Sequence, residues 1–237
     1  MLNPKQISNI LFLDIETVPQ CQNYQDSSPT TQYLWGLKTS YLQEYNKKTA
    51  EELYDKAGIY AEFGKIVCIS VGYFRDQKFR IRSFAQENEK TLLEDFAQLV
   101  NKHFNKKQHL LCAHNGKEFD FPFIARRMLI NKVEIPNTLN SAGKKPWEVK
   151  HLDTMELWKF GDYKHYTSLQ LLAHIFNIPT PKDDISGADV AQVYYKDKDL
   201  NRIVAYCQKD VITIARLYQC FVNLAPFTDD QLIISTS

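Results

Sequence analysis

The sequence predicts an α/β domain, and three observations support that fold class. Apolar runs of strand length, such as Ile10 to Leu13, alternate with segments whose apolar residues recur at helical spacing, as in 87–104. Acidic residues follow the first apolar run at once, and open α/β sheets bind ligands beyond the carboxyl ends of their strands. The length of 237 residues suits one such domain with a sizeable core. We therefore expect a single domain over 1–237.

The elements of this fold can be assigned in chain order. We expect strands at 10–13, 65–74, 79–84, 108–113 and 149–152, with the second and third joined as a hairpin. We expect helices at 87–104 and 121–131, from about 153, at 168–176, and from an N-cap at Asp199 to about 224. The polar, aromatic-rich stretch at about 18–62 is an insertion, in which Thr49 to Glu52 forms a capping box that opens a helix toward Gly58.

Four acidic residues are the candidate catalytic and metal-binding groups. Asp14 and Glu16 are two apart, so they project from the same face of a strand. Asp120 lies between a predicted strand and a predicted helix, and Asp210 lies one helical turn after Tyr206. Carboxylates that converge at one end of a sheet repel each other unless cations lie between them, and hard oxygen ligands favour Mg²⁺ or Mn²⁺. The pattern therefore predicts two-metal phosphodiester chemistry.

Each of these residues also has an ordinary structural interpretation. Asp14 and Glu16 could be solvated acids at an exposed strand end. Asp120 could be a helix N-cap, and we expect it to combine that role with metal binding. Tyr206 and Asp210 could lie on an exposed helix face. A further acid, Asp153, is also explained by a helix N-cap, so we do not count it among the ligands.

Three motifs in this order resemble those of the DEDDy branch of the DEDD 3′-5′ exonuclease superfamily. They are Asp14-x-Glu16, Asn115-x-x-x-Phe119-Asp120 and Tyr206-x-x-x-Asp210, with Ala205 where the histidine branch carries its histidine. With further matches at 62–70, 151–154 and 186–190, the chain is similar to stand-alone proteins related to the proofreading exonuclease domain of family B DNA polymerases. The resemblance extends from about residue 8 to about residue 220.

The resemblance implies a ribonuclease-H-like fold of the DnaQ-like exonuclease type. This fold has a mixed five-stranded sheet flanked by helices, here with a helical insertion after the first strand. The implied activity is hydrolysis of phosphodiester bonds at the 3′ ends of single-stranded DNA, with release of nucleoside 5′-monophosphates and with two divalent cations, Mg²⁺ or Mn²⁺, as cofactors. Two alternatives stay open, a 3′-5′ exoribonuclease of the same superfamily and a non-catalytic module that binds nucleic acid or a polymerase. A proofreading role would need a separate polymerase or repair partner.

The remaining candidate residues are assigned roles toward the substrate. Tyr206 is expected to orient the attacking water, because an unperturbed pKa of about 10 makes it a poor general base. In the family the neighbourhood of Thr17 meets the 3′-terminal sugar, although a turn hydroxyl explains Thr17 equally well. Asn115 would hydrogen-bond a phosphate or the metal-bound water. Phe119 could stack on a base or pack in the core, and His114 could simply bond the backbone.

The charge of the chain limits how nucleic acid could be held. The net charge is only +1, so a binding groove must be locally basic or must recruit cations through its own carboxylates. Basic groups occur at 102–107, 126–127, 144–145 and 196–202, of which we expect the first and last to be solvated helix faces. Arg126 or Arg127 could line the groove, because both follow Asp120 on the same predicted helix. Lys182 is typical of a solvated surface lysine.

Cysteine content and apolar patterning predict the compartment. Five scattered cysteines without a C-x-x-C pair, with Cys68 and Cys112 in apolar settings, indicate buried thiols in a reducing compartment. No opening stretch has the regions of a signal peptide, and no apolar run approaches 18 residues. We therefore expect a soluble cytoplasmic protein without a membrane partner.

Overall fold

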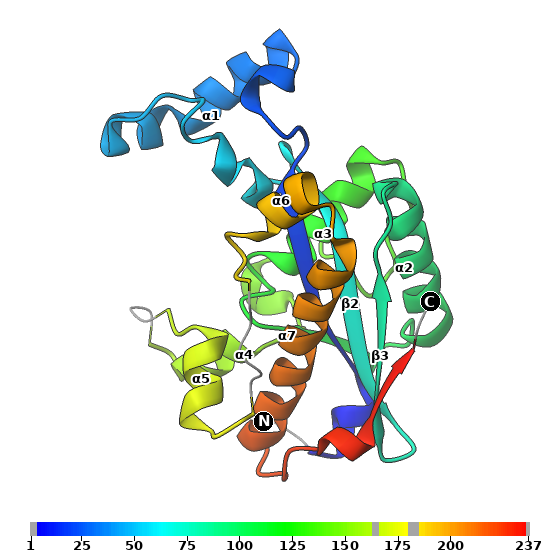
Figure 1. The fold of residues 1–237 in the computed structure, drawn as a ribbon. Helices are drawn as coiled ribbons and strands as arrows, with labels where there is room; N and C mark the ends of the chain where they lie inside the picture. Colours follow the sequence, from blue (N-terminus) through cyan, green and yellow to red (C-terminus); the bar gives the residue numbers. More distant parts are fainter. Residues whose placement is uncertain (1–3, 163–165, 180–184, 236–237) are drawn as a thin grey trace.

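The computed structural model of this protein describes residues 4–162, 166–179 and 185–235. Its centre is a mixed sheet of six strands in the order β5-β4-β1-β2-β3-β6 (Figure 1). The strands are β1 (Ile10–Pro19), β2 (Gly64–Arg75), β3 (Lys78–Phe84), β4 (Leu110–Ala113), β5 (Leu152–Asp153) and β6 (Leu232–Ser235). Strand β1 runs antiparallel to β2 and parallel to β4. The predicted α/β class is confirmed.

The helices follow the predicted order after the first strand. They are α1 (Pro29–Asn46), α2 (Glu89–His103), α3 (Asp120–Ile130), α4 (Thr154–Lys159), α5 (Leu169–Ile175), α6 (Val190–Gln192) and α7 (Leu200–Phe221). Short turns of other helical types are η1 (Pro4–Asn9), η2 (Tyr24–Asp26), η3 (Tyr54–Ile59), η4 (Pro146–Glu148), η5 (Val193–Asp197) and η6 (Asp229–Gln231). The N-cap prediction for α7 is confirmed, because the side chain of Asp199 accepts a hydrogen bond from the Arg202 amide at 3.0 Å.

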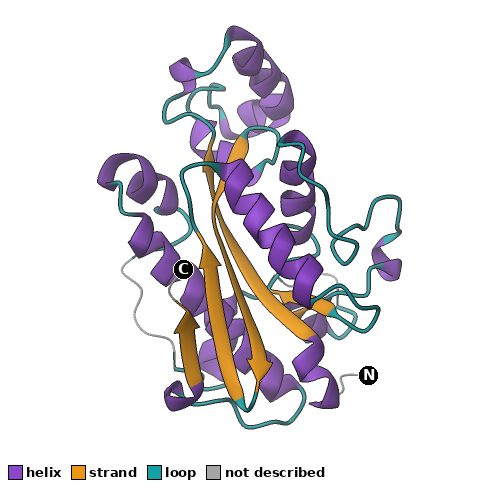
Figure 2. Cartoon of the chain, turned by 90° about the vertical axis from the view of Figure 1, so that its right-hand side faces the viewer, coloured by secondary structure: helices purple, strands orange, loops and turns teal. Residues whose placement is uncertain are grey.

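Alternation along β1 divides the core into two layers. Leu11, Leu13 and Ile15 pack beneath α2 and α3, whereas Ile10 and Phe12 pack toward α7 on the opposite face. Figure 2 shows the sheet with helices on both of its sides. Because successive strand residues point to opposite faces, the face that holds Ile10 and Phe12 also receives the side chains at positions 14 and 16. The strand pattern therefore directs both acids toward α7.

The sheet has one strand more than the five expected. Strand β6 pairs in parallel with β3, so that Phe79 lies opposite Leu232 and Arg82 opposite Ser235. Only four residues long and half-exposed or exposed, β6 carries a weak strand pattern, and its pairing depends on a partner about 150 residues earlier in the chain. The predicted β2–β3 hairpin is present, with Asp76 and Gln77 both at positive φ in a two-residue turn.

The insertion after β1 is helical as expected, but its main helix is not the one predicted. The capping box at Thr49 and Glu52 forms, yet only the 3₁₀ turn η3 follows it. The longer helix is α1, which packs Trp35 into a small separate core with Leu53, Tyr54, Ala57 and Phe63. In Figure 1 the insertion projects from the end of the sheet at which β1 finishes. A Cβ on Gly58 would lie 3.2 Å from the Val18 backbone, so η3 packs closely on β1.

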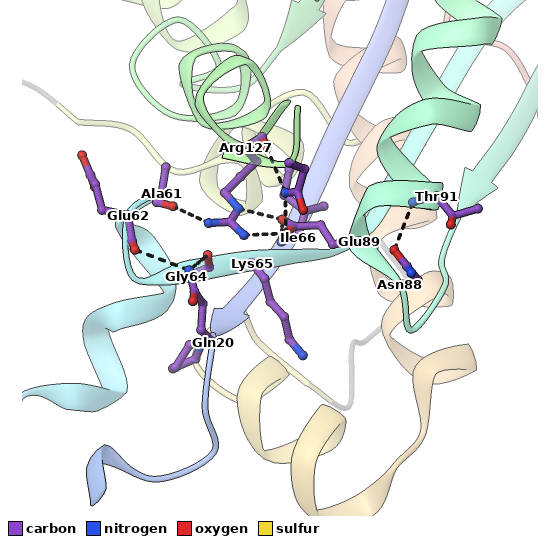
Figure 3. A network of polar contacts seen from close by, with 12 residues as sticks. Gln20, Ala61, Glu62, Gly64, Lys65, Ile66, Asn88, Glu89, Thr91 and Arg127 are labelled. Carbon is purple, nitrogen blue, oxygen red and sulfur yellow. Dashed lines mark hydrogen bonds and ion pairs between the residues drawn. The ribbon is translucent and has the colours of Figure 1, made fainter. Parts of the chain in front are cut away.

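A buried ion pair joins the two helices that cover one face of the sheet. Arg127 of α3 donates two hydrogen bonds to Glu89 of α2, at 2.8 and 2.5 Å, and one to the carbonyl of Ala61 at 2.8 Å (Figure 3). Glu89 also accepts from the backbone amide of Ile66 and from the side chain of Asn131. Of the two arginines expected as candidates for lining a groove, Arg127 is thereby excluded, because its charge is balanced inside the protein, and the exposed Arg126 stays a candidate.

Membrane insertion through helices finds no support in the described ranges. None of the helices within 4–162, 166–179 and 185–235 is both long and apolar enough to cross a bilayer.

Candidate active site

Strand β1 brings Asp14 and Glu16 to the face of the sheet that α7 covers. The strand continues beyond the apolar run Ile10 to Leu13 as far as Pro19, so that both acids lie within it. Its parallel neighbour β4 pairs only as far as Phe12 opposite Cys112, so both acids lie past the last parallel pair. The ligand-binding position at the carboxyl ends of parallel strands is thus kept within a longer strand.

Helix α7 carries Tyr206 and Asp210 to the same face. Its apolar residues Ile203, Cys207, Val211 and Ile214 recur at helical spacing and are fully buried on this side of the sheet. Asp210 lies beside this stripe, and its charge acts on three other carboxylates: those of Asp14, Glu16 and Asp120. The four predicted acids are therefore close enough together for their charges to interact.

Asp120 enters the cluster from the start of α3. It is 3% exposed and is the first residue of the helix, while Phe119 is the N-cap position and makes no side-chain cap. The N-cap role expected for Asp120 is therefore wrong. One carboxylate oxygen of Asp120 is buried without a hydrogen-bond partner. This acid is held at a helix N-terminus, where a negative charge is favoured, and it keeps an unused ligand atom.

Three acids of the cluster, Asp14, Glu16 and Asp120, have raised pKa values. Burial raises the pKa of Asp14 well above its usual range, and the charges of Asp210, Glu16 and Asp120 raise it further. Burial and the charges of Asp210, Cys68 and Asp120 do the same to the pKa of Glu16, which hydrogen-bonds with Asp14. Burial raises the pKa of Asp120 to about 7, with Asp153 and Asp210 adding to the shift and backbone hydrogen bonds opposing it.

Asp153 organises the loop that precedes α3. Its carboxylate is 2% exposed and caps α4, accepting from the amides of Met155 at 2.9 Å and Glu156 at 3.3 Å. It also accepts from the amides of Asn115 at 3.0 Å and Lys117 at 3.1 Å. The N-cap interpretation of Asp153 is confirmed. Sequence reasoning missed the hydrogen bonds from the amides of Asn115 and Lys117 to Asp153. These bonds fix the loop after β4 to the neighbouring strand β5.

Asn115 occupies a constrained position in this loop. Its φ of 62° lies in the left-handed region, which asparagine tolerates better than most residues. The adjacent Gly116 has no room for a side chain, because a Cβ there would lie 2.4 Å from that of Ala113. The side-chain oxygen of Asn115 is buried and has no hydrogen-bond partner. The loop thus presents a second oxygen whose hydrogen-bonding capacity is unused.

Three further candidates take different positions. Thr17 is half-buried next to the register shift that follows Glu16 in β1. Phe119 is also half-buried and packs against Phe123, with ring centroids 5.3 Å apart, so the core interpretation accounts for much of its surface. His114 bonds Thr154 and the backbone oxygen of Thr167, both at 2.9 Å, which agrees with the expectation of a backbone-bonding histidine.

Cys207 lies among the acids and had no place in the predicted site. Its sulfur lies within 4.8 Å of carboxylate oxygens of Asp14 and Glu16 and donates a hydrogen bond to the backbone oxygen of Asp14 at 3.4 Å. Burial raises the pKa of this thiol well above its usual range. Cys207 therefore stays protonated and helps to dock α7 on β1. Its spacing to Ile203 and Val211 indicates a sheet-facing position, but not that acids lie opposite.

The donor set suits hard divalent cations. Four carboxylates supply oxygen atoms, and one oxygen of Asp120 is buried without a hydrogen-bond partner, so it is available as a ligand. Charged groups of one sign in a buried cluster are costly unless they are paired or coordinate a metal. The residues present therefore fit Mg²⁺ or Mn²⁺. Lys182, which was also singled out from the sequence, lies outside the described residues.

Comparison with known proteins gives consistent results. The family model described as "Predicted 3'-5' exonuclease related to the exonuclease domain of PolB" matches residues 59–231. A DNA polymerase of Pyrococcus glycovorans is 19% identical over 171 residues, which cover 63% of this chain and 21% of the polymerase. The matched family segment contains Asp120, Tyr206 and Asp210, whereas Asp14 and Glu16 precede it.

The structural comparison supports the same fold. The family B DNA polymerase from the hyperthermophilic archaeon Pyrobaculum calidifontis aligns with a TM-score of 0.57 at 15% identity, covering 90% of this chain and 24% of the polymerase. The chain thus spans about a fifth to a quarter of the length of these two relatives. The ribonuclease-H-like fold is confirmed, with six strands in place of five. From the family match over most of its length, the chain belongs to the predicted 3′-5′ exonucleases related to the exonuclease domain of PolB.

Proposed function

We propose that this protein is a metal-dependent 3′-5′ exonuclease that removes nucleoside 5′-monophosphates from the 3′ ends of single-stranded DNA. The observation that carries the proposal is the meeting of four acids from β1, α3 and α7, of which Glu16 and Asp120 are buried and Asp14 and Asp210 half-buried, with an unpartnered oxygen on Asp120. A buried structural acid is ordinarily paired with a cation, whereas Glu16 and Asp120 are buried next to further acids whose charges raise their pKa values.

Asp14, Glu16, Asp120 and Asp210 would hold two divalent cations. When bound, such cations lower the pKa of water and stabilise charge that develops on the attacking and leaving oxygens of a phosphodiester. The protein's own contribution is to fix these four carboxylates on three rigid elements and to exclude water from around them. Burial lowers the local dielectric constant, which strengthens electrostatic interactions at the site. The same desolvation raises the pKa values of Asp14 and Glu16.

Tyr206 and Asn115 would position the reacting groups. Tyr206 is one turn before Asp210 on α7, so the two side chains lie on the same face of the helix. The tyrosine hydroxyl would orient the attacking water. The unpartnered amide oxygen of Asn115 would accept a hydrogen bond from that water. Thr17 follows Glu16 directly and would meet the terminal sugar, and the exposed part of Phe119 would support a base.

The test uses a 5′-labelled single strand of DNA and a matched strand of RNA. With Mn²⁺ or Mg²⁺ the labelled DNA should shorten one nucleotide at a time from its 3′ end, and excess EDTA should stop the reaction. A blocked 3′ end should resist, and a fully paired blunt duplex should react more slowly because its terminus must first fray. Preferred cleavage of the RNA would support the exoribonuclease alternative. Cleavage of circular single strands, or activity in EDTA, would contradict the proposal.

A further inference from the structure

A basic cavity lies at the end of the sheet opposite to the acid cluster. It has a volume of about 320 Å³ and is lined by the segments that lead into β4 and β5, including Lys106, Lys107, Lys144 and Lys150. Residues Leu110 and His151 at its floor stand at the amino-terminal ends of these strands, whereas Asn115 and Asp120 lie beyond their carboxyl ends. The length of β4 separates the two sites by roughly 13 Å along the strand direction.

The cations of this cavity are not neutralised by the protein. In the part of the chain that the structure describes, Lys106, Lys107 and Lys150 form no ion pair, and the ammonium group of Lys144 bonds only a backbone oxygen, that of Asn140. One acid, Glu148, lines the same cavity, and its carboxylate is engaged by the backbone amide of Lys145 at 2.7 Å. In a chain whose net charge is only +1, such a concentration of unpaired lysines is local.

The floor of the cavity is neutral and fixed. His151 accepts from the Leu111 amide at 3.2 Å and donates to the backbone oxygen of Thr138 at 2.9 Å, so both of its ring nitrogens are used. Burial lowers the pKa of His151 to about 4, and the nearby charges of Lys144 and Lys117 contribute. Lys117 lies on the loop after β4 and is paired with Glu156 at 2.7 Å, so the unpaired positive charge is confined to the cavity.

An exposed aromatic stands among the lysines. Trp147 is 77% exposed, on the short turn η4 between Lys144 and Lys150. The ammonium group of Lys145 lies 5.2 Å from the centre of its ring. Positively charged side chains and exposed aromatic rings together bind single-stranded nucleic acid without reading its sequence, because the charges contact the phosphates and the rings stack on the bases.

We propose that this basic cavity, together with the exposed Trp147 that directly precedes the lining residue Glu148, binds the backbone phosphates and one base of a single-stranded nucleic acid, away from the 3′ terminus being cleaved. The ligand class rests on the proposed function, whereas the cavity and its charges do not. At about 320 Å³ the space lies near the lower limit of ligand pockets and accommodates one or two phosphate groups. The lysines contact phosphates, so binding is independent of sequence and falls with salt concentration.

The test measures binding of 5′-fluorescein-labelled oligo(dT) of 25 nucleotides in EDTA, where cleavage is off. For Lys107→Ala/Lys150→Ala we expect the Kd to rise about tenfold. The slope of log Kd against log salt should fall by about 1.4, since each phosphate contact on a single strand contributes about 0.7. Lys47→Ala/Lys48→Ala, which removes two exposed lysines at the end of α1, is the matched control and should leave both values unchanged. Oligo(dT) should also quench tryptophan fluorescence in the wild type and not in Trp147→Phe/Lys150→Ala.

A turnover assay separates this site from the active site. With Mn²⁺, hydrolysis of bis(p-nitrophenyl) phosphate, which is too small to span both sites, should stay within about twofold of wild type in Lys107→Ala/Lys150→Ala. Loss of that small-substrate activity, or an equal effect of the control pair, would overturn the proposal. The proposal would also be overturned if Lys107→Ala/Lys150→Ala weakened the binding of dTMP or inorganic phosphate while the affinity for oligo(dT) stayed unchanged. A wild type inactive on every diester would contradict the exonuclease function, and oligo(dT) binding in EDTA would still test the cavity.

Discussion

Glu16 and Glu89 are buried to a similar degree, at 7% and 9% exposed, but Glu89 lies beside a cation and Glu16 lies beside further acids. Glu89 accepts hydrogen bonds from Arg127, Asn131 and the Ile66 amide, so its negative charge is balanced inside the protein (Figure 3). Glu16 faces further acids, and its pKa is raised. A buried acid with a complete set of partners holds helices together, whereas a buried cluster of acids is costly unless something else binds there.

The largest effect should come from removing a ligand of the acid cluster. In Asp14→Ala or Asp210→Ala, one of four carboxylates is lost and the remaining acids are no longer matched to two cations. Activity on a 5′-labelled single strand should fall to near background, with the fold of the protein retained in circular dichroism. Glu118→Ala, which removes an exposed acid two residues before Asp120, should keep the wild-type rate. Substantial activity in Asp14→Ala and Asp210→Ala would contradict the assignment of the acid cluster to catalysis.

Breaking the buried ion pair between Arg127 and Glu89 should lower the stability of the protein and not change its catalytic chemistry. Arg127→Ala leaves Glu89 buried without its cation, which should lower the free energy of unfolding by about 3–5 kcal/mol. Urea unfolding should show this loss equally with Mn²⁺ and with EDTA. The neighbouring Arg126 is exposed, and Arg126→Ala should change stability by no more than about 0.5 kcal/mol. Equal stability of the two variants would show that the pair is not structural.

A smaller effect on rate should follow from Tyr206→Phe. This change keeps the ring and deletes only the hydroxyl, so the metals stay bound and the water is misplaced. The rate should fall on the order of tenfold to a thousandfold, by the usual contribution of positioning groups. The Mn²⁺ concentration for half-maximal activity should change little. A fully active Tyr206→Phe would mean that the tyrosine only packs, and loss of metal binding would mean that it belongs to the ligand set.

Local patterns were sufficient to predict the parts of the fold that carry the acids. The apolar run before Asp14, the alternation through Glu16 and the helical spacing around Asp210 each involve neighbours in the chain, and each predicts a direction for its acid. The order of strands and helices then followed from the same periodicities. Grouping the acids at one site needed the spacing of the motifs and their resemblance to a known family.

Features that depend on distant partners were missed. Strand β6 is four residues long and is defined by pairing with β3, so its own sequence carries little signal. Helix α1 buries only Trp35 and Thr39 and shows exposed tyrosines and leucines on its other side, which obscures its period. The choice between Arg126 and Arg127 could not be made from the sequence, because Glu89, the partner of Arg127, is 38 residues away. The bonds from Asp153 to the Asn115 loop are equally remote in sequence.

The central claim is that the acid cluster binds divalent cations, and the thermal stability of Asp120→Asn tests it most directly. The pKa of Asp120 is about 7 in the folded chain against 3.8 as its ordinary value, so the folded state holds this proton more tightly. Stability in EDTA is therefore lost as pH rises from about 4 through 7, and this loss should be smaller in the variant, in which only Asp14 and Glu16 still contribute through their raised pKa values. At pH 8 in EDTA, Asp120→Asn should melt roughly 5 °C above wild type, the shift expected for about 2 kcal/mol in a chain of this size. Mn²⁺ should reverse the order by stabilising the wild type far more than the variant. Glu118→Gln should follow the wild type under both conditions. If Asp120→Asn melted below wild type in EDTA and gained as much from Mn²⁺, the acids would not be a cation site.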